Sequence, residues 1–331
     1  MSIVAGVALA IGVVAYAVFG GADFGAGFWD LIAGGAQRGR APRALIDHSL
    51  GPVWEANHTW LIYCLVVFWS AFPAAFAAVM TTLYVPLGLA AFGIVLRGSG
   101  FAFRKVVVHT AQQRLAGAAF AASSVVTPFF LGVVGGGIAS GRVPAQGHGD
   151  PLHSWWNPTA LFAGALAVIA SAYLAAVFLT SDARADADGS LEDYFRRRAW
   201  AAAWVTGILS AAGLVVARFD APRLFSRLIT VALPAVLVSV VCGGAALILL
   251  RRAAPRRVRL LAAGAIAALL IGWSVAQYPY VLGTHSALNA VAAPRTALVT
   301  LTVIVGIAIV LVAPSFALLY VLQQRARLRT H

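Results

Sequence analysis

Long apolar runs, separated by short polar and basic segments, dominate the pattern of this 331-residue chain. About twenty consecutive apolar residues are needed to cross a bilayer as a helix. The pattern therefore predicts nine transmembrane helices, with only Phe72 and Pro73 marking the break before the third. The runs cover residues 2–22, 56–74, 76–96, 115–137, 159–180, 199–217, 228–250, 260–280 and 296–321.

We expect an all-α, polytopic membrane protein with a single integral membrane domain. The first run has no basic segment and no small-residue cleavage site, so we expect it to be a retained helix and not a cleaved signal. The even helix spacing allows two four-helix bundles with one helix left over. The expected divisions are a first bundle at 1–137, an outer loop at 138–157, a second bundle at 158–280, and the last helix with an inner tail at 281–331.

Composition and charge agree with this class. Hydrophobic residues make up 61% of the chain and charged residues 11%, which excludes a soluble globule of this length. The net charge of +13 does not indicate a nucleic-acid-binding face, because the basic residues lie in short clusters between apolar runs. If the N-terminus is outside, the inner segments hold 19 of the 24 Lys and Arg residues. This asymmetry predicts a cytoplasmic C-terminus.

The stretch from Gly51 to Trp60 places a carboxylate, an amide and an imidazole at the mouth of an apolar run. An acid at the centre of a membrane helix costs on the order of 3 kcal/mol. Glu55 must therefore lie near an edge, pair with another group or face a water-filled cavity. Glu55 and His58 are three residues apart and share one face of the predicted helix.

Asp23 is a second acid beside an apolar run. It lies in a glycine-rich turn, where Gly21 and Gly25 would let another backbone approach closely. The predicted topology places Asp23 and Glu55 toward the inner face, where two close acids would share a proton near neutral pH. Alternatively, Glu55 only complements the positive end of its helix after Pro52, and Asp23 binds exposed amides. The residues alone leave both interpretations open.

The residue pattern does not indicate a metal centre in this chain. Glu55 and His58 have the Glu-x-x-His spacing of carboxylate di-iron bundles, but that site needs further glutamates and only Glu192, in a loop, remains. His58, His109 and His285 are candidate haem ligands, yet no two lie at matching depth on two helices. We therefore expect no metal ligands here and a hydrogen-bonded role for a lone histidine.

Arg97 and Arg104 flank the glycines and aromatics that close the third predicted helix. Their guanidinium groups could bind a lipid phosphate, a quinone headgroup or a partner's carboxylate. An ordinary positive-inside anchor explains Arg104 better, whereas Arg97 lies deeper in its run. An aromatic belt accounts for tryptophans near the predicted interfaces, such as Trp60.

Several motifs resemble those of subunit II of cytochrome bd-type quinol oxidases, in order over nearly the whole chain. The most specific match joins the stretch at 51–61 to the segment at 97–104, and the second half is matched mainly by topology. The motifs are Gly-Ala-Asp-Phe-Gly-Ala-Gly at 21–27, Gly-Pro-Val-Trp-Glu-Ala-Asn-His-Thr-Trp-Leu at 51–61, Phe72-Pro73, Pro86-Leu87, Arg97-Gly98, Phe101 to Arg104, and Tyr278-Pro279.

The resemblance implies the non-haem subunit of a bacterial terminal oxidase that takes electrons from membrane quinol and reduces oxygen to water. It implies nine helices in two four-helix bundles plus one peripheral helix, packed against a haem-bearing subunit I that carries haems b and d. Such an oxidase is electrogenic without pumping protons and lies in the cell membrane. Small accessory membrane chains and a structural quinone or lipid could accompany it; nucleic acid is not an expected partner.

The resemblance also suggests a proton path through Asp23, Glu55 and His58. Family members often have another acid where this chain has Gly20, so a relay here would have one carrier fewer and would need water. Gly283 replaces a proline expected after the Tyr-Pro pair. The residues expected to make structural, partner or lipid contacts are Asn57, Trp60, Arg97 and Arg104.

Two other functions remain open at this point. A stand-alone, proton-coupled secondary transporter would use the same two acids, but transporters place their sites near the midplane at broken helices. Here the polar residues gather at the inner edge. A purely structural partner would use the acids only to satisfy helix ends. We favour the oxidase subunit, with a proton or oxygen path.

Overall fold

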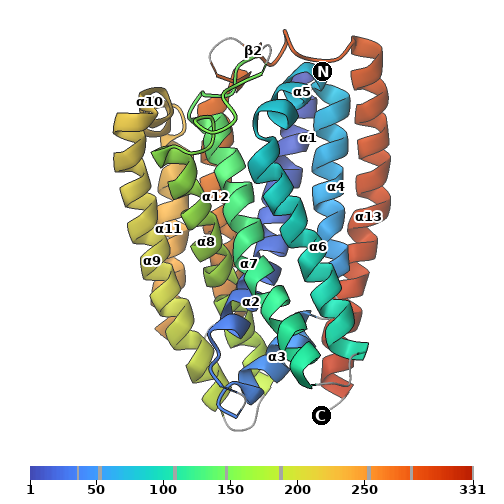
Figure 1. Ribbon diagram of the computed structural model, residues 1–331, viewed down its shortest axis with the longest axis vertical. Helices are drawn as coiled ribbons and strands as arrows, with labels where there is room; N and C mark the ends of the chain where they lie inside the picture. The colour runs from blue at the N-terminus through green and yellow to red at the C-terminus, as the bar shows by residue number, and fades with distance from the viewer. Residues whose placement is uncertain are drawn as a thin grey trace.

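The computed structural model describes residues 1–35, 37–50, 54–106, 110–145, 148–185, 189–251, 255–283 and 286–329. Most of them lie in helices that run side by side along the longest axis of the molecule (Figure 1). The helices are α1 (Ser2–Ala15), the π-helical turn η1 (Tyr16–Gly20), α2 (Gly21–Leu31), α3 (Arg40–Leu50), α4 (Trp54–Ala71), α5 (Pro73–Thr82), α6 (Tyr84–Val106), α7 (Thr110–Ala139), α8 (Pro158–Asp182), the 3-10 turn η2 (Ala183–Ala185), α9 (Ser190–Asp220), α10 (Pro222–Ile229), α11 (Leu233–Arg251), α12 (Pro255–Gln277) and α13 (Arg295–Arg329).

The described residues contain seven helical segments long and apolar enough to cross a membrane, or eight if the bent pair α4 and α5 counts as one span. The sequence predicted nine, and the prediction of one helix over 76–96 is wrong. α5 ends at Thr82, and the apolar part of α6 is the shorter segment Tyr84–Gly100. α4 and α5 bend by 119° at Pro73, which begins α5 and has no N–H to continue the preceding helix.

The first span is longer than the sequence predicted. α1, η1 and α2 form one span, Ser2–Leu31, so Asp23 lies in the first turn of α2 and not in a turn after the helix. Glycine has a low helix propensity, but tertiary packing overrides it here. The π-helical turn ends at Gly20, three residues before Asp23, and such turns are frequent at functional sites.

Small residues allow α2, α7 and α8 to pack closely. A Cβ atom on Gly25 of α2 would lie 1.9 Å from the backbone oxygen of Ser171 on α8. A Cβ atom on Gly136 of α7 would lie 2.6 Å from the Cα atom of Ala160 on α8. Close van der Waals contact of this kind holds helices together in lipid, where burial of apolar surface adds little. The prediction that Gly25 admits another backbone is confirmed, and that backbone is α8.

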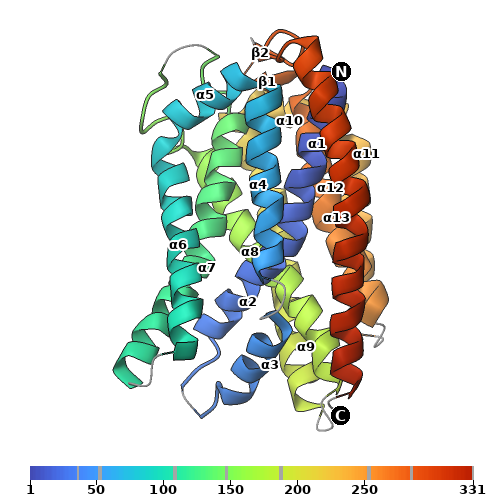
Figure 2. The ribbon, with the colours of Figure 1, turned by 90° about the vertical axis from the view of Figure 1, so that its right-hand side faces the viewer.

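α8 lies at the centre of the helix packing, against α2, α7, α9 and α12. α6 packs on α7, α11 on α12, and α1 on both α4 and α12. α13 lies at the edge, against α4 and α1 (Figures 1 and 2). The N-terminus lies at the same end as α5 and α10, whereas the C-terminus and α3 lie at the opposite end (Figure 1).

A short antiparallel hairpin precedes α13 and pairs β1 (Tyr280–Leu282) with β2 (Ser286–Ala287). Gly283, which follows β1, has a φ of +54°. This left-handed conformation favours glycine and is closed to proline, whose ring fixes φ near −65°. The backbone therefore explains why glycine stands where the resemblance led us to expect proline.

Replacing Gly25 by alanine should destabilise the protein by about 3 kcal/mol, because the added methyl group meets rigid backbone and not a flexible side chain. The matched control is Gly213→Ala on α9, where nothing lies within 4 Å of the new atom. That change should be neutral or stabilise the helix by about 0.5–1 kcal/mol. Thermal denaturation of the purified protein in detergent compares the two, and equal midpoints would contradict the close α2–α8 packing.

Candidate functional site: a buried ion pair between three helices

A buried ion pair joins α2 to α6. Arg97 on α6 donates through Nη2 to Oδ1 of Asp23 at 2.8 Å and to the backbone carbonyl of Asp23 at 2.9 Å. Its Nη1 atom donates to the hydroxyl of Ser124 on α7 at 2.5 Å. Arg97 and Asp23 are each 1% exposed. One guanidinium group therefore connects three helices through hydrogen bonds.

The surroundings of this guanidinium compensate for its removal from water. The rings of Phe24 and Phe120 lie 5.0 Å and 4.4 Å from its central carbon, within the range of cation–π attraction. Gly27 leaves the space that the group occupies, because a Cβ atom there would lie 3.0 Å from Nη1 of Arg97 and 2.0 Å from Oγ of Ser124. A buried charge is tolerated only when it is paired and hydrogen-bonded in this way.

An aromatic group borders the ion pair. Tyr16 of η1, Phe24 of α2 and His58 of α4 contact one another edge to face, with ring centroids 6.2–6.4 Å apart. His58 therefore lies against the residue that directly follows Asp23. The structure brings together two of the three residues that the sequence assigned to a proton path.

Several buried polar atoms of this cluster have no hydrogen-bond partner within the part of the chain that the structure describes. They are the Tyr16 hydroxyl, Oδ2 of Asp23 and Nε of Arg97. Leaving such an atom unsatisfied costs about 1–3 kcal/mol, so buried polar atoms of this kind are usual binding places for ordered water. Asp23 and Arg97 thus neutralise each other's charge, but each keeps one polar atom without a hydrogen-bond partner among the described residues.

Other sequence-predicted residues lie on the same helices. Asn57 of α4 is buried and donates to the carbonyl of Phe19 in the π-helical turn at 3.3 Å. Trp60 contacts Tyr63 edge to face at 6.0 Å. Glu55 lies on α4 and Arg104 on α6, but their side chains lie outside what the structure describes, and so do residues His109 and His285.

The sequence did not identify the partner of Arg97. The sequence predicts a structural contact or a partner's carboxylate, a lipid phosphate or a quinone headgroup for Arg97, and the structure places an acid of the same chain against it. Asp23 and Arg97 lie 74 residues apart. The sequence does contain one indication of this pair: Asp23 lies beside an apolar run and Arg97 within one, and an unpaired charge there is costly.

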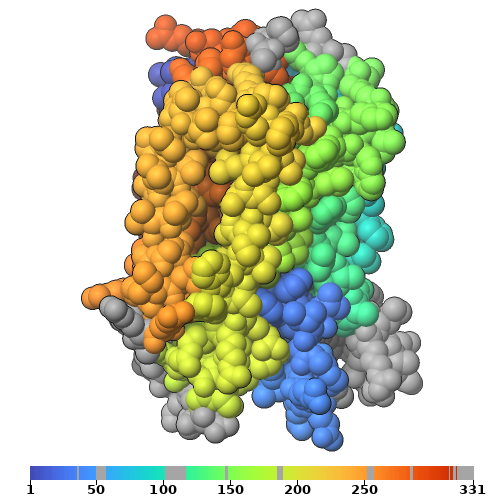
Figure 3. Space-filling model, turned by 90° about the vertical axis from the view of Figure 1, so that its left-hand side faces the viewer, coloured from blue at the N-terminus to red at the C-terminus, as the bar shows by residue number. Residues whose placement is uncertain are grey.

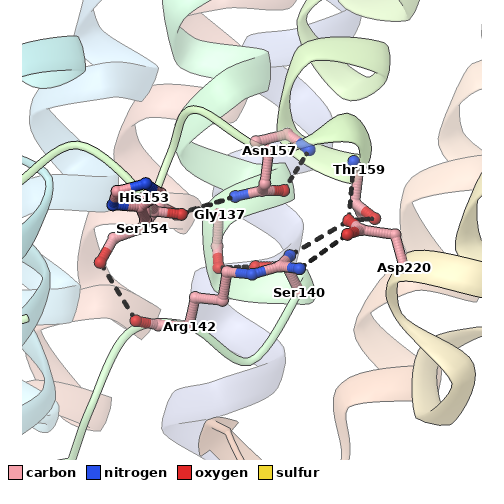
Figure 4. Close-up of polar contacts among 9 residues, drawn as sticks. Gly137, Ser140, Arg142, His153, Ser154, Asn157, Thr159 and Asp220 are labelled. Carbon is pink, nitrogen blue, oxygen red and sulfur yellow. Dashed lines mark hydrogen bonds and ion pairs between the residues drawn. The ribbon is translucent and has the colours of Figure 1, made fainter. Parts of the chain in front are cut away.

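A second polar network (Figure 4), between the start of α8 and the end of α9, was also not predicted. Arg142 donates to both carboxylate oxygens of Asp220, at 2.6 and 3.1 Å. Thr159 donates to Oδ2 of Asp220 through its backbone N–H at 3.0 Å and its hydroxyl at 2.6 Å. Asn157 caps α8 by accepting from the N–H of Ala160. This network clamps the end of α9 to the start of α8.

Comparisons with known proteins all point to one family. The model of the family described as cytochrome bd terminal oxidase subunit II matches residues 1–323. Cytochrome bd ubiquinol oxidase subunit 2 of Bacillus subtilis (strain 168) is 29% identical over 114 residues, which are 34% of this chain and 33% of that protein. Cytochrome bd-I ubiquinol oxidase subunit 2 of Escherichia coli (strain K12) is 27% identical over 128 residues, 39% of this chain and 33% of that protein. The matched segments thus span about a third of each curated relative.

The fold is similar to that of a chain in the structure of bd oxidase from Geobacillus thermodenitrificans. The TM-score is 0.82, and the superposition covers 96% of this chain and 97% of that chain. The two sequences are 23% identical, so this likeness concerns the fold alone.

Replacing Arg97 by glutamine should destabilise the protein by about 3–5 kcal/mol, because it leaves the Asp23 carboxylate buried without a countercharge. The double variant Asp23→Asn with Arg97→Gln should lose less than the sum of the two single variants. Thermal denaturation of all four proteins gives the coupling energy. The matched control is Arg196→Gln, which breaks the exposed pair with Asp193 and should cost less than about 1 kcal/mol. Additive losses at Asp23 and Arg97 would show that the pair is not coupled.

Proposed function

This chain belongs to the cytochrome bd terminal oxidase subunit II family, whose model matches residues 1–323, and from this premise we propose that it is the haem-free subunit of a quinol-oxidising, oxygen-reducing oxidase. As a member of this family with several apolar spans, it is a multi-pass membrane protein. Its proposed place is the bacterial cell membrane, beside a haem-bearing subunit I. The proposed oxidase builds a membrane potential without pumping protons.

The proposal assigns haems b and d to subunit I. The part of the chain that the structure describes contains no group of three or more His, Cys, Asp or Glu side chains that could hold a metal ion. The role of this chain in haem chemistry would then be indirect: it supports the haem subunit and shapes access to it. A quinone or lipid and small accessory chains are further proposed companions.

We propose nine membrane crossings, with the N-terminus outside and the C-terminus cytoplasmic. The bundles would be 1–137 and 158–280, joined by the outer loop 138–157, with the last helix of 281–331 at the periphery. The edge position of α13 and the opposite placement of the two termini support this arrangement (Figure 1). So does the excess of basic residues on the predicted inner segments.

The proposed inner-face path for protons uses Asp23, Glu55 and His58. The observation that carries it is the group of unsatisfied polar atoms around the buried ion pair, namely Oδ2 of Asp23 and the Tyr16 hydroxyl. Because Arg97 binds Asp23 at 2.8 Å, this carboxylate is best suited to orienting water as a fixed charge. Glu55 and His58 would then be the groups that take up and release protons. Oxygen could use the same route.

Glu55→Gln should lower quinol-dependent oxygen consumption of the complete oxidase by about tenfold or more, because the amide cannot carry a proton, while haem content stays intact. Oxygen-electrode assays on membranes, normalised to the haem spectrum, measure this. The matched control is Glu192→Gln, which changes the other glutamate of the chain, in the predicted inner connection, and should leave turnover unchanged.

The other outcomes discriminate between functions. Normal turnover of the Glu55→Gln oxidase would support a scaffold whose acids only satisfy helix ends. Loss of haem together with turnover would support a structural role toward subunit I and contradict a proton path. If the chain purified in mild detergent brings no haem-bearing partner with it, the assignment to an oxidase complex fails.

A further inference from the structure

A hollow runs between α9 and α11 on the face shown in Figure 3, and atoms of α12 lie at its base. Its two walls belong to separate packing pairs, because α9 packs chiefly on α8 and α11 chiefly on α12. The space-filling view shows that α9 and α11 leave the space between them open on this face (Figure 3).

The outward faces of α9 and α11, on either side of this α9–α11 groove, are apolar and exposed. On α9, Ile208 is 62% exposed and Val215 59% exposed. On α11, Val241 is 66% exposed and Ile248 56% exposed. Side chains of this kind on membrane helices contact lipid chains, so an acyl chain at this groove would meet apolar surface on both sides.

A cation stands at one mouth of the groove, at the end of the molecule that holds the C-terminus and α3. Arg251 is the last residue of α11, and its guanidinium carbon lies 5.0 Å from the ring centroid of Trp200 on α9. Trp200 in turn contacts Trp204 edge to face at 5.8 Å. The 19 residues of α11 rise about 28 Å, close to the thickness of the hydrocarbon core. Arg251 and the two tryptophans therefore stand at the level of the lipid headgroups.

No described carboxylate pairs with the charge at this mouth. Arg251 is exposed and forms no ion pair with the residues that the structure describes, and the same holds for Arg197 on α9. The described acids of the neighbouring segment are already paired with other arginines. These pairs are Arg184–Glu192, Arg196–Asp193 and Arg259–Asp182.

We propose that the α9–α11 groove is a binding site for one anionic phospholipid. Arg251 binds the headgroup phosphate, and one acyl chain lies between α9 and α11 over α12. A guanidinium group donates two parallel hydrogen bonds to phosphate. Charge complementarity selects an anionic lipid over a zwitterionic one, because no carboxylate of the described chain neutralises Arg251. This site is separate from the proposed proton path and does not depend on oxidase turnover.

Native mass spectrometry of the complete complex, titrated in detergent with phosphatidylglycerol or phosphatidylcholine, tests the site. The wild-type complex should retain one phosphatidylglycerol in preference to phosphatidylcholine. Arg251→Gln should weaken phosphatidylglycerol binding about fivefold, the effect of removing one cation at a lipid surface, and should leave phosphatidylcholine unchanged. Arg251→Lys should keep most of the binding. The matched control is Arg295→Gln at the start of α13, which should change neither lipid.

Three results would overturn the proposal. The first is equal binding of phosphatidylglycerol by the wild type and Arg251→Gln. The second is complete competition by millimolar inorganic phosphate, which would indicate an anion site without an acyl chain. The third is an additional protein chain whose presence in the complex, seen as extra protein mass, excludes the bound phosphatidylglycerol. An unchanged haem spectrum and unchanged oxygen consumption of each variant show that it folds and assembles.

Discussion

A charge inside an apolar helical protein must find its countercharge within the same structure, and the Asp23–Arg97 pair shows what this requirement imposes. Its hydrogen bonds tie α2, α6 and α7 together. Two aromatic rings and the missing side chain of Gly27 shape the space around it. The close approach of α2 to α8 at Gly25 then fixes α2 on its other side. The Asp23–Arg97 pair and the close packing on α8 thus both fix the position of α2.

The Asp23–Arg97 network and the Arg142–Asp220 network differ in how many of their polar atoms are hydrogen-bonded. Asp220 accepts four hydrogen bonds from Arg142 and Thr159, so both of its carboxylate oxygens are already hydrogen-bonded. Asp23 keeps one oxygen without a partner among the described residues. A saturated carboxylate suits a structural clamp, whereas an unsaturated one can bind water and take part in proton movement. This contrast, more than burial alone, distinguishes the candidate site from the clamp.

The sequence predicted the positions of most spans, because an apolar run of membrane length has few alternatives to a helix. The run 159–180, for example, became α8 (Pro158–Asp182). The prediction failed at 76–96, where the stretch is apolar almost throughout and the marks of the break, Thr82 at the end of α5 and Pro86 in the first turn of α6, are weak. Asp23, His58 and Arg97 could be singled out as polar groups in apolar surroundings. The contact between Asp23 and Arg97 could not be predicted, because pairing across 74 residues depends on helix packing and leaves no local pattern in the sequence. The role of Glu55 stays a prediction.

The separation of Asp23 from Arg97 also has a consequence for synthesis. Ribosomes add about 5–20 residues per second, so the segment that carries Asp23 emerges roughly 4–15 seconds before the arginine that will neutralise it. During that interval the acid must stay protonated, remain in contact with water or be shielded by the insertion machinery. The Asp23–Arg97 contact itself can form only after α6 has been made, so the final packing of α2 depends on a helix that is synthesised later.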